Sequence, residues 1–205
     1  QSFCLRLYLF DINVSECGIR LIDRNESTTY CVTLMDGNRI AAGKNAISLE
    51  GAHAQIQQCT FKGTQGYCIY ALGSDTELLV NDWGSTAEGI LKQEWFLTIS
   101  GQERTGADWS GPWVPSDGAD VAVRDPNGAL AFEDKCGNGG RCRTNLTEYI
   151  IALNESRTDY SPYNITLLKP MTGMGKARVE LVNNTNTLVS LFPLPDLALE
   201  FLELP

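Results

Sequence analysis

Tryptophans and a neighbouring carboxylate are the side chains of this sequence best suited to bind a ligand. All four tryptophans, Trp83, Trp95, Trp109 and Trp113, lie between residues 83 and 113. An exposed indole is a flat platform on which a sugar ring can stack, and a nearby carboxylate can accept hydrogen bonds from its hydroxyls. Trp109 and Trp113 share a loop that contains Gly and Pro, next to Asp108, and such a loop buries rings less readily than a strand. We predict a carbohydrate-binding surface of Trp109, Trp113, Trp83 and Asp108, with core packing as the alternative for each ring.

Catalytic machinery of the nucleophilic kind is scarce. His53 is the only histidine, so any Ser-His-Asp or Cys-His scheme depends on it, and the sequence contains no Gly-x-Ser-x-Gly motif. Glycoside hydrolysis needs only two carboxylates on opposite sides of the scissile bond. Several lie near the tryptophans: Asp82, Glu88, Glu94, Glu103, Asp108, Asp117 and Asp120. A secreted carbohydrate-active hydrolase is therefore the alternative function, although no motif singles out a pair and we favour a protein that is not an enzyme.

The sequence offers few side chains that could bind a metal ion. One histidine and cysteines expected to be oxidised leave too few ligands for a zinc site of the usual kind. Oxygen ligands for calcium gather in one turn-rich stretch at Asp117, Asp120, Asp125, Asn127, Glu133 and Asp134, but their spacing matches no EF-hand loop. Asp and Asn are also common at hairpin ends. We therefore expect no cofactor, with calcium as the alternative.

The seven cysteines predict disulfides in an exported chain. Cys136 and Cys142 bracket a glycine-rich stretch that can bring their Cα atoms to bonding distance. Cys59 and Cys68 flank a turn at Gly63, so a hairpin there would place their sulfurs opposite each other. Cys4, Cys17 and Cys31 would then hold one more bridge and an odd thiol, through which copies of the chain could join.

Six Asn-x-Ser/Thr triplets place the chain in the secretory pathway, with acceptors at Asn13, Asn25, Asn145, Asn154, Asn164 and Asn183. None lies between residues 31 and 144, the segment that carries the tryptophans. Because a glycan obstructs the surface it covers, this central segment is where a partner contact is expected. The chain begins at Gln1, which fits a mature form whose signal peptide has been removed.

Charge and hydropathy exclude several partners. A net charge of −9 is the wrong sign for attracting phosphate backbones or anionic lipid, so nucleic acid is not an expected partner. No apolar run approaches the roughly 18 residues of a membrane span, so we expect no insertion. An extracellular binding module remains, with a glycan or an extracellular protein as ligand. A third function is that of a cell-surface or assembly protein whose β edges or odd cysteine join it to copies of itself.

Short alternating runs are the elements that must position these residues. They occur at residues 5–10, 18–22, 29–35, 67–72, 77–80, 94–100, 120–124, 148–153, 164–168, 177–182, 187–192 and 197–202. Turn residues separate them, notably Asp36-Gly37 and Asp125-Pro126-Asn127-Gly128. We predict a single all-β domain over residues 1–205, an antiparallel sandwich or barrel of jelly-roll type with little helix. The alternative is a parallel β-helix, favoured by the rung-like runs within residues 45–80 but by no repeat outside them.

Overall fold

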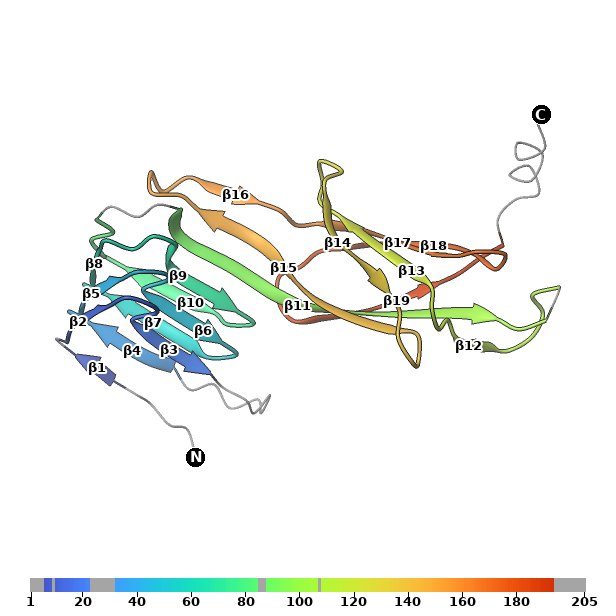
Figure 1. Cartoon of the computed structure of the whole chain (residues 1–205), viewed down its shortest axis with the longest axis horizontal. Coiled ribbons are helices and arrows are strands. Elements are labelled where there is room, and N and C mark those ends of the chain that lie inside the picture. Colours follow the sequence, from blue (N-terminus) through green and yellow to red (C-terminus); the bar gives the residue numbers. More distant parts are fainter. Residues whose placement is uncertain (1–5, 9, 23–31, 85–87, 107, 194–205) are drawn as a thin grey trace. The chain divides into compact units, whose positions relative to one another are not determined.

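The computed structural model describes the chain apart from residues 1–5, 9, 23–31, 85–87, 107 and 194–205 (Figure 1). Strands β1 to β19 and their loops account for the described residues, and none of these residues is helical. The predicted all-β class is confirmed. Contacts divide the chain into two compact units, Gln1–Trp95 with Thr147–Asp159, and Phe96–Leu146 with Tyr160–Pro205. The single domain over residues 1–205 stays a prediction.

The first unit is a parallel solenoid. Its strands are β1 (Arg6–Tyr8), β2 (Asp11–Val14), β3 (Ile19–Ile22), β4 (Val32–Asp36), β5 (Arg39–Ala42), β6 (Ile47–Glu50), β7 (His53–Gln57), β8 (Thr60–Lys62), β9 (Tyr67–Leu72), β10 (Thr76–Leu79) and the start of β11 (Gly89–Arg104). The chain visits three sheets in turn, so that strands of one sheet come from successive rungs in the orders β1-β4-β7-β10, β2-β5-β8 and β3-β6-β9-β11. Every strand pairing along these orders is parallel.

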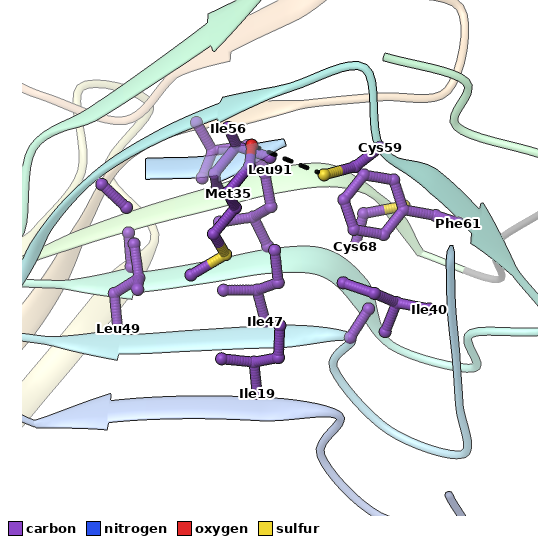
Figure 2. Close-up of a cluster of buried hydrophobic side chains, with 14 of the residues drawn as sticks. Ile19, Met35, Ile40, Ile47, Leu49, Ile56, Cys59, Phe61, Cys68 and Leu91 are labelled. Carbon is purple, nitrogen blue, oxygen red and sulfur yellow. Dashed lines mark hydrogen bonds between the residues drawn. The ribbon is translucent and has the colours of Figure 1, made fainter. Parts of the chain in front are cut away.

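Aliphatic side chains from equivalent positions stack through the solenoid. Ile19 pairs with Ile47, Ile47 with Ile69, and Ile69 with Leu91, which gives rungs of 28, 22 and 22 residues. Ile47 and Ile69 are fully buried, and Ile19 and Leu91 nearly so. Figure 2 shows Ile19, Ile47 and Leu91 in one column beside Met35 and Phe61. Successive residues of a strand alternate between its faces. The other face of β9 and of the start of β11 is also partly covered, since Cys68, Ile90 and Glu94 are buried.

One corner of the solenoid repeats a left-handed backbone. Gly37, Gln58 and Val80 follow the stacked strands β4, β7 and β10 and have φ of 66°, 53° and 46°. The next residue in two of the three corners is an asparagine that bonds to the main chain of neighbouring rungs. Asn38, which is fully buried, accepts from the Phe10 amide at 2.9 Å through Oδ1 and donates to the Leu7 carbonyl at 3.0 Å through Nδ2. These side chains tie rungs together where the ladders are interrupted.

The second unit carries the antiparallel pairing that was expected for the whole chain. Its strands are β12 (Trp113–Pro115), β13 (Asp120–Arg124), β14 (Leu130–Lys135), β17 (Tyr163–Lys169), β18 (Gly173–Val179) and β19 (Thr185–Ser190), together with parts of β11 and β15 (Arg141–Ile151); β16 (Arg157–Asp159) belongs to the first unit. Four of them form an antiparallel sheet in the order β14-β13-β17-β18. Strand β19 runs parallel to β11, and β12 antiparallel to it.

Several local predictions are confirmed and one is wrong. Strands β9 and β13 have the expected bounds, and the turn at Asp125 joins β13 to β14 with a φ of 87° at Gly128. The parallel β-helix, given as the alternative fold, describes the first unit. The hairpin expected at Gly63 is wrong, because β8 pairs with β5 and β9 with β6 and β11. None of the sheets in the described residues closes into a barrel, a sandwich in the second unit stays a prediction, and the run at 197–202 lies outside the described residues.

Candidate binding site

Trp113, Phe192 and Trp109 form an exposed aromatic cluster in the second unit. The rings of Trp113 and Phe192 meet edge to face with centroids 6.1 Å apart. The exposed fractions are 37% for Trp113 and 60% for Phe192. Arg104, which faces Trp113 across the β11–β12 pair, places its guanidinium 5.0 Å from the centre of the indole. Edge-to-face packing and the cation–π contact both fix the orientation of the Trp113 ring while much of it stays accessible.

Gly173 connects Trp109 to the same cluster. A Cβ at this position would lie 3.1 Å from Cη2 of Trp109 and would collide with the Phe192 carbonyl oxygen. The indole of Trp109 therefore covers bare backbone that only glycine provides. Trp109 itself has a φ of 58°, a left-handed conformation that is unfavourable for a bulky residue. Strain of this kind concentrates at functional sites, and here it presents a half-buried indole from a loop.

Asp108 holds the loop in shape. Its Oδ1 accepts from the Ser110 hydroxyl at 2.8 Å and from the Ser110 amide at 3.2 Å. The hydroxyl hydrogen bond is the main cause that lowers the pKa of Asp108 below its ordinary value of 3.8. The base of the loop is closed by the Thr105 amide, which donates to the Pro112 carbonyl at 3.1 Å. Asp108 is thus a charged, exposed acceptor next to Trp109 in the sequence.

Trp83 belongs to the first unit, whereas Trp109, Trp113 and Asp108 belong to the second. Its ring stacks on Phe61 with centroids 5.3 Å apart and planes inclined by 13°. Trp83 also packs against the solenoid core and lines a cavity of about 310 Å³ together with Leu78, Val80, Asn81, Ile90, Ile151 and Glu155. The Trp83 ring therefore packs against the core, as the alternative prediction had it, and also borders a cavity.

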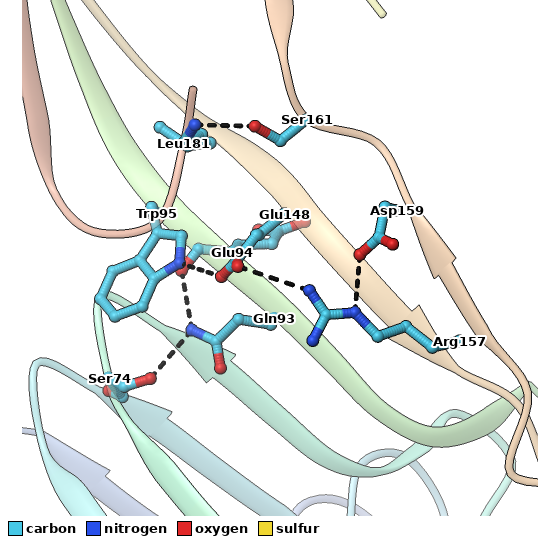
Figure 3. A network of polar contacts seen from close by, with 9 residues as sticks. All are labelled: Ser74, Gln93, Glu94, Trp95, Glu148, Arg157, Asp159, Ser161 and Leu181. Carbon is cyan, nitrogen blue, oxygen red and sulfur yellow. Dashed lines mark hydrogen bonds and ion pairs between the residues drawn. The ribbon is translucent and has the colours of Figure 1, made fainter. Parts of the chain in front are cut away.

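Carboxylates near Trp95 form a polar network within the first unit (Figure 3). Glu148 accepts from the Trp95 indole N–H at 2.6 Å and pairs with Arg157 at 3.7 Å, and Arg157 pairs with Asp159 at 2.6 Å. Trp95 is 5% exposed, so its indole N–H needs this partner.

Glu94, one of the candidate hydrolytic carboxylates, is buried among partners. It pairs with Lys92 at 2.7 Å and accepts from the Tyr70 hydroxyl at 2.6 Å. Two further candidates have structural contacts: Glu103 pairs with Lys169 at 2.7 Å, and Asp117 accepts from the Gly140 amide at 2.6 Å. These contacts give the carboxylates a role in the fold. The catalytic pair stays a prediction.

The stretch expected to offer calcium ligands forms turns and strand pairs. Asp125 accepts from the amides of Asn127 and Ala129 at 2.9 and 2.8 Å, and Asp120 pairs with Lys135 at 3.2 Å. In the described residues no group of three or more His, Cys, Asp or Glu side chains is placed to hold a metal ion. Calcium binding stays a prediction.

The structure places Cys136 and Cys142 side by side but not bonded. Their sulfurs lie 3.8 Å apart, against the roughly 2.05 Å of a disulfide, and both side chains are buried. Cys59 and Cys68 are free thiols in the solenoid core, where they donate to the carbonyls of Met35 and Trp83. Without the hairpin, the geometric reason for a Cys59–Cys68 bridge is lost. Cys17 is free as well, and Cys4 and Cys31 lie outside the described residues.

All five glycosylation acceptors that the structure describes are exposed: Asn13, Asn145, Asn154, Asn164 and Asn183. Asn25 lies outside the described residues. In two of the sequons the acceptor side chain folds back on the hydroxyl residue, since Asn154 Oδ1 accepts from the Ser156 hydroxyl at 2.7 Å and Asn183 Oδ1 from that of Thr185 at 3.3 Å. Accessibility, which attachment of a glycan requires, is thus met.

Phe192 and Arg104 are the members of the site that sequence reasoning missed. Arg104 could have been found, because antiparallel pairing across the loop from Thr105 to Pro112 places it opposite Trp113. Phe192 lies far from the loop in the sequence, and the alternating run at 187–192 suggested only a strand. Its position depends on the tertiary contact between β18 and β19, which no local pattern encodes.

No protein family matches the sequence, and no curated protein matches it. Two similar solved structures are of the shaft pilin SpaA from Lactobacillus rhamnosus GG. Its N-terminal domain has a TM-score of 0.36 at 9% identity over 49% of this chain and 94% of that domain. A longer SpaA structure has a TM-score of 0.34 at 12% identity over 51% of this chain and 50% of that one. At TM-scores this low, the likeness assigns neither fold nor function.

Proposed function

We propose that the protein is an extracellular binding module that uses the aromatic cluster of its second unit to bind a glycan. The observation that carries this proposal is the exposure of Trp113 and Phe192 while Arg104 holds the Trp113 ring in place. Burying exposed aromatic surface against the apolar face of a sugar is favourable, and a ring already fixed loses little entropy on binding. Arg104 as donor and Asp108 as acceptor supply the hydrogen bonds that orient hydroxyl groups.

Glycan identity is addressed by screening the natively glycosylated protein against a glycan array and insoluble polysaccharides. For a saccharide that binds, Trp113→Ala should weaken affinity at least about tenfold, because loss of one stacked ring costs on the order of 1.5 kcal/mol. Phe192→Ala should weaken the affinity less, because Trp113 keeps its own ring and its cation–π contact with Arg104 in this variant.

Leu188→Ala is the matched control for Phe192→Ala, because Leu188 is also 60% exposed and belongs to the same unit. It should bind as the unmodified protein does. Two results would refute the proposal: no saccharide bound in either screen, or affinity unchanged by Trp113→Ala.

Extracellular location is supported by the exposure of the five described sequon asparagines. The described residues contain no helix long and apolar enough to cross a membrane. Expression in a secreting eukaryotic cell should yield medium-borne protein whose mass falls on treatment with an N-glycosidase. Asn154→Gln should remove one glycan, whereas the same change at Asn127, which lies outside any sequon, should remove none.

A further inference from the structure

Three exposed arginines lie on one sheet of the second unit. In this sheet β15, β12 and β19 all pair with β11. Arg104 is on β11, and Arg141 and Arg143 are at the start of β15, within the second unit. The ion pairs among the described residues all involve other basic side chains. The three guanidinium groups are therefore available to a ligand.

Alternation along β11 turns Arg104 outward. Leu97 and Ile99 are buried, and a Cβ added to Gly101 would lie 2.5 Å from the side chain of Leu167. These odd-numbered positions therefore face the interior of the second unit. Because successive residues of a strand point to opposite faces, the even-numbered positions from 96 to 104 form an outward row, and Arg104 is the last of them.

The start of β15 adds Arg141 and Arg143 to the same face. Cys142 lies between them and is buried, so the two arginines point away from the interior. The guanidinium of Arg143 lies 4.2 Å from the centre of the Phe96 ring, which belongs to the outward row of β11. We call Arg104, Arg141 and Arg143 the arginine face.

The neighbouring outward positions carry no negative charge. Neither the outward row of β11 nor positions 141, 143 and 145 of β15 include Asp or Glu. Glu103 of β11 lies on the interior side, where it accepts from the buried Ser116 hydroxyl at 3.0 Å and pairs with Lys169 at 2.7 Å. The chain as a whole has a net charge of −9, so the arginine face is a local reversal of sign. Such a surface attracts anions.

Two of the guanidinium groups are held by aromatic rings. Arg104 lies 5.0 Å from the centre of the Trp113 indole, and Arg143 has its corresponding contact with Phe96. Contact over a ring engages the planar face of a guanidinium, and its N–H edge can still donate two parallel hydrogen bonds to a carboxylate or a sulfate. A group held in place in this way loses less entropy when it binds a ligand.

We propose that the glycan bound by the aromatic cluster is anionic, and that the arginine face binds its carboxylate or sulfate groups. This inference rests on the proposed function, because it names the class of ligand for the same site. Arg104 belongs to both surfaces through its contact with Trp113. Positions 96 and 104 are eight residues apart, so the outward row of β11 is about 26 Å long at about 3.3 Å per residue. A row of this length suits a chain of several sugar rings.

Asn145, one of the sequon asparagines, lies at one end of the arginine face. It is exposed and follows Arg143 by two residues, on the outward side of β15. A glycan on Asn145 would obstruct this end. Asn145→Gln should therefore bind the anionic ligand at least as tightly as the glycosylated protein does. Weaker binding by Asn145→Gln would contradict the part assigned to Arg143.

Three soluble polysaccharides test the proposal by titration calorimetry. Dextran sulfate carries sulfate groups, polygalacturonate carries carboxylates, and dextran is neutral. At least one of the two anionic polymers should bind at least about tenfold more tightly than dextran, and its affinity should fall as the salt concentration rises. The anionic polymer that binds identifies the charged group that the arginines recognise.

Arginine variants locate the binding. Arg141→Gln and Arg143→Gln should each weaken the affinity for the anionic polymer by about three- to tenfold, because each removes a charge-assisted hydrogen-bonding group. Neither residue contacts Trp113, so these variants leave the ring of the aromatic cluster in place. Arg178→Gln is the matched control, since Arg178 is exposed on β18 in the antiparallel sheet and the change in net charge is the same. It should bind as the unmodified protein does.

Several results would overturn the proposal: no binding of either anionic polymer, equal affinity for dextran, or equal weakening by Arg178→Gln. Poly-glutamate bound as tightly as the polysaccharides would show that the face recognises an acidic polypeptide instead. A neutral saccharide whose binding depends on Trp113 but not on Arg141 or Arg143 would overturn this inference and leave the proposed function standing. Conversely, an anionic polymer that depends on the arginines but not on Trp113 would refute the proposed role of the aromatic cluster.

Discussion

Asn38 offers the sharpest test of how the solenoid rungs are tied together. The side chain is fully buried, and its amide joins the Phe10 N–H at 2.9 Å to the Leu7 carbonyl at 3.0 Å. Asn38→Ala removes both partners and leaves two main-chain groups of the first rung without them. An unsatisfied buried group costs roughly 1–3 kcal/mol, so the loss of both partners should lower the unfolding free energy by about 2–6 kcal/mol.

Urea denaturation measures this loss. With an m-value of about 2 kcal/mol/M, the urea midpoint of the first unit should fall by roughly 1–3 M. Hydrogen exchange supplies a local reading, because the Phe10 amide should lose its protection in the variant. Asn186→Ala, which truncates an exposed asparagine on β19, should change stability by less than about 0.5 kcal/mol. If Asn38→Ala changed the unfolding free energy as little as this control and the Phe10 amide stayed protected, the stabilising role assigned to the two Asn38 hydrogen bonds would be wrong.

Three further predictions follow from single contacts. Phe61→Ala should lower the unfolding free energy by about 3–5 kcal/mol and expose Trp83 to water, seen as a red shift of its emission, because the two rings stack in the core. Mild oxidation should join Cys136 to Cys142, detectable as a loss of two mass units, and should stabilise the second unit by about 2 kcal/mol if closure is unstrained. Burial, followed by the hydrogen bond to Glu94, raises the pKa of Tyr70 above its ordinary value of 10.0. Above about pH 10 the unfolded chain therefore releases a proton that the folded chain keeps, so stability falls as pH rises, and Tyr70→Phe should flatten that fall.

Strand content was predictable because alternation of apolar residues is a local signal. β9 and β13 match their expected bounds, and the turn at Asp125 is where Pro and Gly require it. Strand pairing was not predictable from the same signal, since parallel and antiparallel strands alternate alike. A change in rung length from 28 to 22 residues hid the repeat of the solenoid from inspection of the sequence.

In the aromatic cluster too, only the features that depend on neighbouring residues in the sequence were predictable. Trp113, which was expected to share a loop with Trp109, instead begins strand β12. The loop that carries Trp109 was predictable from its Gly and Pro residues. Phe192 and Gly173 were not, because they meet the loop through contacts distant in sequence. Between Cys59 and Cys68 a local signal was misleading. The turn at Gly63 predicted a hairpin, but β8 and β9 belong to different sheets of the solenoid and pair with β5 and β6.

The most direct test of the proposed function is an NMR titration of the four indole N–H resonances with a saccharide from the screen. The Trp113 resonance should shift on addition of ligand with a single saturation curve, and that of Trp109 should follow it. Trp95, whose indole N–H is bonded to Glu148 in the first unit, should stay unchanged and serves as the internal reference. A bound saccharide that left the Trp113 resonance in place, or shifted only that of Trp83, would contradict the assignment of the aromatic cluster as the binding site.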